Sequence, residues 1–156
     1  MTVADDQKIE VKRLVDAPRD LVFDTFTQRE HVVNWWVPEG TEIHEWDPQP
    51  GGLWRYSMPG PDGNLMPFRI AFIEIDKPTR LVYDFSPDME GAPEPVRTIV
   101  DFAEESGKTR ITLTLTYASA AAREQAMQYG AAAGAQQALG SLADYLATLK
   151  PSAINP

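Results

Sequence analysis

The chain has 156 residues, of which 43% are hydrophobic and 24% are charged, the composition of an ordinary globular domain. Its formal net charge of −9 at pH 7 argues against binding to a nucleic-acid backbone, which requires clustered Lys and Arg. It contains no cysteine, which excludes disulfides, thiol nucleophiles and thiolate metal sites, and no apolar run near the roughly 20 residues that span a bilayer, so we expect no membrane partner.

One strand and two short helices are predicted for the N-terminal quarter of the chain. The N-terminus lacks the basic and apolar regions of a signal peptide, so we expect a cytoplasmic protein. Apolar and polar residues alternate over 7–15, which predicts a strand. Asp16 is expected to cap a helix that holds Pro18 in its first turn, and a second helix is predicted from residue 28 or 29 to Trp36, before Pro38.

Strands separated by glycine- and proline-rich turns are predicted for the middle of the chain. A proline- and glycine-rich loop is expected over 87–95, and a connection over 104–108 is expected to join the last two strands as a hairpin. The predicted strands span residues 41–46, 53–58, 65–75, 80–86, 96–103 and 109–117. The large side chains that share a face at every second position are Trp54, Tyr56 and Met58, then Leu81, Tyr83 and Phe85, then Ile111, Leu113, Leu115 and Tyr117.

A single long helix is predicted for the C-terminal part of the chain. Ser119 is expected to cap it, and it should run to about Leu149 and end before Pro151, a length of roughly 45 Å at about 1.5 Å per residue. Gly130 and Gly134 lie about one turn apart in this helix, and each costs about 0.8–1.0 kcal/mol relative to alanine. Three explanations stay open: close packing of the sheet against the glycines, space left for a ligand, or a break of the helix at Gly130.

The order of these elements predicts an α+β helix-grip fold. Consecutive antiparallel strands joined by short turns cannot bury both faces by themselves, so the long helix has to cover the concave face of the sheet. We expect a curved antiparallel sheet of about seven strands around the C-terminal helix, with two short helices after the first strand. A single domain over residues 1–156, with its core at about 8–149, follows.

Large aromatic and methionine side chains on the inward strand faces predict a cavity that binds an apolar small molecule. Such pockets are mostly apolar with a few polar anchors, and buried hydroxyls need hydrogen-bond partners, which makes Tyr56 and Tyr83 the candidate anchors. The alternative is that these side chains simply fill the core. The predicted ligand-binding residues are Trp36, Trp54, Tyr56, Met58, Phe68, Tyr83, Phe85, Met127 and Gly134.

The sequence contains no constellation typical of catalysis, metal binding or cofactor binding. His44-Glu45 begins like a zincin motif, but the second histidine of that motif is missing, and no serine lies in a G-x-S-x-G nucleophile elbow. Glycine clusters lie between predicted strands rather than at strand-to-helix phosphate loops. We therefore expect no metal, no cofactor and no enzymatic activity, with an acid–base role for His31 or Glu42 as the open alternative.

An ordered series of short motifs runs through nearly the whole chain. Its members are Ala17-Pro18 with Val22-Phe23, Trp35-Trp36, Asp47-Pro48 with Gly51-Gly52 and Trp54-Arg55, Gly60-Pro61-Asp62-Gly63, Glu74-Ile75 with Pro78 and Arg80-Leu81, Gly107-Lys108-Thr109, and Gly134 with Leu139 and Leu142. Over about residues 8–149 the series resembles the activator of heat-shock ATPase homologue family, a branch of the START-like (Bet v 1-like, polyketide cyclase-related) superfamily.

The resemblance implies a seven-stranded helix-grip fold with a hydrophobic cavity, but it implies more than one activity. Members include a cochaperone domain that stimulates a heat-shock ATPase, and relatives bind lipids, hormones or polyketides or catalyse cyclisation. The family often has an aromatic residue after the helix glycine, where this chain has Ala135, which implies a larger cavity here. The leading expectation is a cytoplasmic, non-enzymatic binder of a hydrophobic small molecule. The alternatives are a cochaperone-like partner of a chaperone ATPase in the stress response and a cyclase- or hydrolase-like enzyme.

Overall fold

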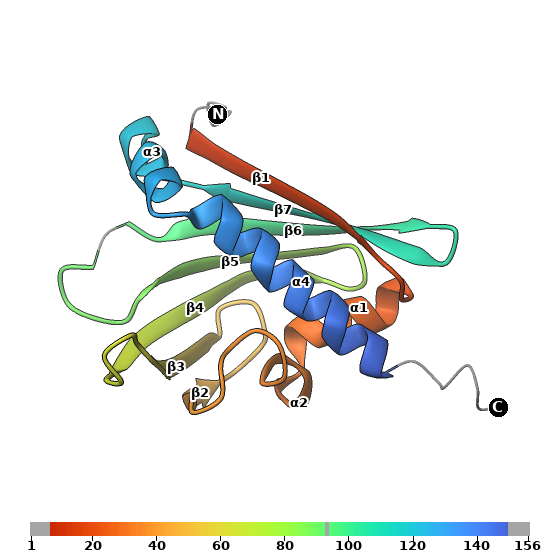
Figure 1. Cartoon of the computed structure of the whole chain (residues 1–156), viewed down its shortest axis with the longest axis horizontal. Helices are drawn as coiled ribbons and strands as arrows, with labels where there is room; N and C mark the ends of the chain where they lie inside the picture. Colours follow the sequence, from red (N-terminus) through yellow and green to blue (C-terminus); the bar gives the residue numbers. More distant parts are fainter. Residues whose placement is uncertain (1–6, 93, 150–156) are drawn as a thin grey trace.

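Seven strands form one antiparallel sheet in the computed structural model, which describes residues 7–92 and 94–149 (Figure 1). The strand order is β1-β7-β6-β5-β4-β3-β2, so each strand from β2 onward pairs with the next one in sequence, and β1 lies beside β7. The strands are β1 Lys8–Val15, β2 Glu42–Trp46, β3 Leu53–Pro59, β4 Leu65–Asp76, β5 Arg80–Pro87, β6 Val96–Glu105 and β7 Lys108–Thr116. Together with the helices, this sheet confirms the predicted α+β helix-grip fold.

The helices follow the first and the last strand. α1 (Arg19–Thr27) and α2 (Arg29–Val32) lie between β1 and β2, and α3 (Ala120–Gln128) and α4 (Ala131–Leu149) come after β7. Figure 1 shows α4 crossing the sheet, with α1 near the C-terminal end of α4 and α3 at its other end. Within the described residues, every helix falls short of the apolar length that is needed to cross a bilayer.

The core lies between the sheet and the C-terminal half of α4, and it continues beneath α1. Leu139, Leu142 and Leu146 are the buried residues of α4. At the α1 end, the ring of Phe26 meets that of Phe102 on β6 edge to face, with 5.3 Å between ring centroids. Edge-to-face aromatic pairs add about 0.5–1.5 kcal/mol to the burial of their apolar surface, so α1 is firmly attached to the sheet.

The predicted continuous C-terminal helix is wrong, because the helix is broken at Tyr129 and Gly130. Gly130 has φ = +85°, in the left-handed region where glycine carries no penalty, and this ends α3 before α4 begins. Ser119 is confirmed as the cap, since its hydroxyl accepts a hydrogen bond of 3.0 Å from the Ala122 amide. With 19 residues, α4 is about 28 Å long rather than 45 Å. The predicted end before Pro151 lies outside the described residues.

The first helices also differ from the prediction. Pro18, and not Asp16, occupies the N-cap position of α1, and its carbonyl accepts the first helical hydrogen bond from the Val22 amide at 3.0 Å. α2 ends at Val32 and continues to Trp36 only as turns. The buried Trp35 donates from its indole Nε1 to the Thr25 carbonyl at 2.8 Å. We attribute the short helix to this tertiary contact, which local helix propensity does not anticipate.

The connection between β6 and β7 is shorter than predicted. The strands extend to Glu105 and from Lys108, so the turn consists of Ser106 and Gly107 alone. Both residues have positive φ, +53° and +82°, the combination of a type I′ turn, whose twist matches that of the flanking strands. The pairing of β6 with β7 therefore extends to the end of the hairpin, where Glu105 lies opposite Lys108.

Candidate functional site

The side chains on the inner face of α4 change from small to large along the helix. Its first turns present Ala131, Gly134 and Ala135, whereas Leu139 and Leu142 are buried in the core. Because alanine and glycine cannot reach the strands, space remains beneath these first turns, and a cavity of about 500 Å³ lies there. Its walls are formed by Trp36, Met58, Tyr83, Phe85, Val96, Thr98, Leu113, Leu115, Tyr117, Ala131, Gly134 and Ala135.

The floor of the cavity follows the cross-strand pairing of β5, β6 and β7. Phe85 lies opposite Val96, and Tyr83 lies opposite Thr98, which in turn lies opposite Leu115. Directly opposite side chains on one face are about 4.5–5.5 Å apart at Cβ, so these residues form a continuous surface. It is apolar except for the hydroxyls of Tyr83 and Thr98.

These hydroxyls are buried and uncharged. Tyr83 is 7% exposed and Thr98 is 1% exposed. Burial raises the pKa of the Tyr83 hydroxyl well above its usual range, an effect that hydrogen bonding with Thr98 opposes only in part. Burial likewise raises the pKa of Tyr56, and the neighbouring Tyr83 raises it further. The polar part of the wall therefore consists of neutral groups that can both donate and accept hydrogen bonds.

The predicted ligand-binding residues fall into two groups. Those that line the cavity are Trp36, Met58, Tyr83, Phe85 and Gly134. Trp54 and Tyr56 are buried in ring contact, with centroids 4.4 Å apart, and lie outside the lining. Phe68 stacks on Phe85 at 5.5 Å, and Met127 on α3 is 37% exposed. The alternation along a strand identifies the face of a side chain but not its depth, which is why both groups were predicted together.

The predicted set lacks seven of the twelve residues that line the cavity. Val96 and Thr98 come from β6 and carry no aromatic ring, but the pairing of β5 with β6 places them beside Phe85 and Tyr83. Leu113, Leu115 and Tyr117 share one face of a predicted strand, but the alternation alone does not show that this face borders the cavity. Ala135 lies in the cavity wall, and the larger cavity that the family resemblance implies stays a prediction.

The structure separates the explanations for the two glycines. A Cβ atom built at Gly134 would meet no other atom within 4 Å, so close packing against the sheet, the first explanation, is wrong there. Gly134 borders the cavity instead. Gly130 breaks the helix through its positive φ. The two glycines thus have different structural roles: Gly134 leaves space at the cavity, and Gly130 separates α3 from α4.

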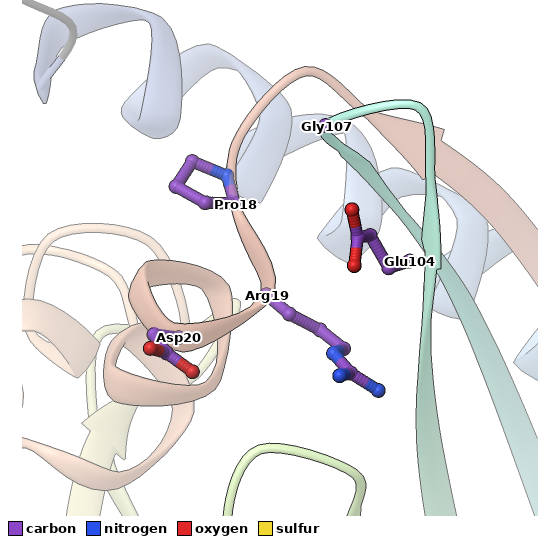
Figure 2. A pocket seen from close by; sticks show the side chains of 5 residues that line it. All are labelled: Pro18, Arg19, Asp20, Glu104 and Gly107. Atoms are coloured by element: carbon purple, nitrogen blue, oxygen red, sulfur yellow. The ribbon is translucent and has the colours of Figure 1, made fainter.

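Two further hollows are distinct from this cavity. An apolar hollow of about 500 Å³ lies beneath α3, and it shares Val96 and Tyr117 with the cavity. A polar hollow of about 280 Å³ lies between the start of α1 and the β6–β7 hairpin. Figure 2 shows Asp20 and Glu104 on opposite sides of the Arg19 side chain in this hollow. Its mixed charges and small size suit water better than an apolar ligand.

Both histidines form one hydrogen bond with a hydroxyl. His31 Nδ1 lies 2.7 Å from the Tyr145 hydroxyl, and His44 Nε2 lies 2.8 Å from Ser57 Oγ. Ser57 alternates with Tyr56 along β3, so it faces away from the side of the sheet that α4 covers. Among residues 7–92 and 94–149, no group of three or more His, Cys, Asp or Glu side chains is placed to hold a metal ion.

The comparisons with known proteins agree with this architecture. A family model described as activator of Hsp90 ATPase homolog 1-like protein matches residues 16–147. No curated protein matches the chain. A crystal structure of a Mycobacterium smegmatis protein is 24% identical, with 91% of each chain covered and a TM-score of 0.78. A Nitrosomonas europaea protein is 22% identical, with 94% of this chain and 97% of that chain covered and a TM-score of 0.80.

A solution structure of an Arthrobacter aurescens protein is 20% identical, with 92% of this chain and 87% of that chain covered and a TM-score of 0.81. At these identities, the solved structures establish the shared fold alone. The family model extends from the end of β1 almost to the end of α4 and includes most of the cavity-forming elements. The chain therefore belongs to the activator of Hsp90 ATPase homolog 1-like family, within the START-like superfamily.

Proposed function

We propose that the protein binds an apolar small molecule in the cavity between α4 and strands β5, β6 and β7. The observation that carries the proposal is the run of small residues on the first turns of α4, which leaves about 500 Å³ unfilled beside a well-filled core. Ligand pockets commonly enclose about 300–1,000 Å³ and are mostly apolar, which fits this volume and this wall.

The proposal is one of binding without catalysis. The residues that line the cavity include no Asp, Glu, His, Lys or Arg. General acid–base catalysis needs a group whose pKa lies near the working pH, whereas burial moves the pKa of Tyr83 away from neutrality. With no cysteine in its 156 residues, the chain suits a reducing compartment, and we propose the cytoplasm as its location.

Uptake of Nile red, a neutral dye that fluoresces in apolar surroundings, tests the proposal. The wild-type protein should enhance the fluorescence in a saturable way. Ala135→Leu places a larger side chain in the cavity and should weaken the uptake at least about tenfold, because the space is lost. Ala133→Leu is the matched control, since Ala133 is exposed on the same helix, and it should leave the uptake unchanged. Absence of saturable uptake by the wild type, or equal uptake by both variants, would refute the cavity as the binding site.

The family match favours a second candidate, an interaction module that stimulates a heat-shock ATPase. This function would place the protein in the stress response and would use its surface rather than its cavity. The test is the ATPase rate of the Hsp90-type chaperone from the same organism, measured with and without the protein. A rise in the rate that Ala135→Leu does not diminish would support this candidate. An unchanged rate at saturating protein would remove it.

A further inference from the structure

The wall of the cavity, as the described residues define it, carries no charge at neutral pH. Its members are aromatic, aliphatic or hydroxyl-bearing. A charged group that leaves water for such surroundings is strongly disfavoured unless it is paired. At the rim, the positive charge of Arg123 lowers the pKa of the Tyr117 hydroxyl, although burial raises it by more. The Arg123 side chain already has partners in the protein, because its Nε donates to the Lys8 carbonyl at 3.1 Å and its Nη1 lies 4.0 Å from Glu124. The wall therefore favours a ligand without charge.

The two fully buried hydroxyls of the wall lie together on its floor, whereas the third, that of Tyr117, is only half-buried. Tyr83 and Thr98 are direct cross-strand partners on β5 and β6, and both are buried. Thr98 Oγ1 donates to the Val96 carbonyl only over 3.5 Å, which is a weak hydrogen bond. Burial keeps the Tyr83 hydroxyl protonated. The pair can thus donate to a ligand oxygen and also accept from a ligand hydroxyl.

We propose that the ligand is an electrically neutral molecule whose hydroxyl or carbonyl group is held by Tyr83 and Thr98, while its apolar part lies against Phe85, Val96 and Ala135. This inference rests on the proposed function, because it specifies the chemistry of a ligand in the same cavity. It makes Tyr83 and Thr98 the residues that determine specificity. A fatty-acid-like anion would leave its charge unpaired beside them.

Competition with bound Nile red at neutral pH tests the inference. Three competitors share one skeleton and differ in one group: pentylbenzene, para-pentylphenol and para-pentylbenzoate. The phenol should displace the dye at about 3- to 10-fold lower concentration than pentylbenzene, the effect of one or two net hydrogen bonds. The anionic benzoate should be at least about tenfold weaker than the phenol, because its charge would be desolvated without a partner.

Substitution of the hydroxyl-bearing residues locates the effect. Tyr83→Phe and Thr98→Val keep the shape of the wall, and each should reduce the ratio of phenol to pentylbenzene affinity by about 2- to 10-fold. Tyr145→Phe is the matched control, because the Tyr145 hydroxyl bonds to His31 outside the cavity, and the ratio should stay at its wild-type value. The use of two variants keeps the test informative if one of them fails to fold.

The outcomes distinguish this inference from the proposed function. If the wild type takes up no Nile red, the proposed function fails, and this inference fails with it. If the dye binds but the benzoate competes as well as the phenol, a charged ligand is accepted and this inference alone is overturned. An unchanged ratio in both Tyr83→Phe and Thr98→Val would likewise overturn it, and dye binding would still support the cavity.

Discussion

A leucine in place of Gly134 is expected to block the cavity without destabilising the protein. Because a Cβ at this position meets nothing within 4 Å, the substitution removes the helix penalty of glycine, somewhat under 1 kcal/mol. Thermal unfolding should show a higher Tm than the wild type, and Nile red uptake should fall. Gly134→Ala should raise the Tm similarly and spare most of the uptake. A lower Tm for leucine alone would indicate overpacking, which costs about 1–3 kcal/mol.

The buried indoles of Trp35 and Trp54 should respond differently to the same substitution. Trp35 Nε1 donates to the Thr25 carbonyl at 2.8 Å, whereas Trp54 Nε1 has no partner among the described residues. Trp→Phe shrinks both side chains, but only at Trp35 does it leave a carbonyl without its donor. Trp35→Phe should therefore lower the free energy of unfolding by about 1–3 kcal/mol more than Trp54→Phe, as measured by urea denaturation. Equal losses would mean that the Trp35 hydrogen bond contributes little.

For single residues, the sequence predicts the face of the strand on which a side chain lies better than it predicts the tertiary contacts of that side chain. The alternation of Trp54, Tyr56 and Met58 correctly indicates one inward face, because the period of a strand is fixed at two. Which of them reaches the cavity depends on Trp36, whose ring lies 5.1 Å from that of Trp54 and comes from a different part of the chain. No local pattern contains that information.

Because the helix is broken between α3 and α4, substitution of Gly130 and of Gly134 by alanine should change the stability in opposite directions. Gly130 has φ = +85°, where an alanine costs about 1–2 kcal/mol, so Gly130→Ala should lower the stability while Gly134→Ala raises it. Far-ultraviolet circular dichroism of Gly130→Ala should match the wild type. A gain in helix content without a loss of stability would instead reveal one continuous helix, as the sequence predicts.

Helix α3 is expected to open independently of the rest of the molecule. It contains no buried residue, and it is held by the Ser119 cap and by the hydrogen bond from Arg123 Nε to the Lys8 carbonyl. Ser119→Ala should weaken the helix by about 0.5–2 kcal/mol, which should speed amide hydrogen exchange in residues 120–128 but barely move the global Tm. If the Tm falls by the full amount, α3 belongs to the cooperative core.

The helices and strands were predictable where the periodicity of apolar residues determines them. They were not predictable where the backbone conformation of one or two residues determines where an element ends. All the strands could be predicted from alternation and turn residues. The alanine-rich stretch on both sides of Gly130 suits a continuous helix and a broken one equally well, because alanine favours helix in either case. The short turn between β6 and β7 likewise depends on backbone geometry, the positive φ of Ser106 and Gly107, which the sequence pattern does not reveal.

For the molecule as a whole, a ligand in the cavity should raise the stability by mass action. The cavity exists only in the folded chain, so a bound ligand at a hundred times its Kd should add about 2.7 kcal/mol. For a chain of this size, each kcal/mol corresponds to roughly 2–4 °C in Tm. Differential scanning fluorimetry with para-pentylphenol should show this shift in the wild type and not in Ala135→Leu. A lower Tm would mean that the ligand prefers the unfolded chain.

The pairing of β1 with β7 has a consequence for how the molecule is made. The Gln7 side chain donates to the Tyr117 carbonyl across 110 positions in sequence, and the whole of β1 is hydrogen-bonded to β7. Contacts of such long range are slow to form because loop closure comes first. During synthesis, β1 leaves the ribosome early but finds its partner only after β7 has emerged. Until then β1 has no strand partner and β6 has one unpaired edge, which are the features that expose a chain to aggregation.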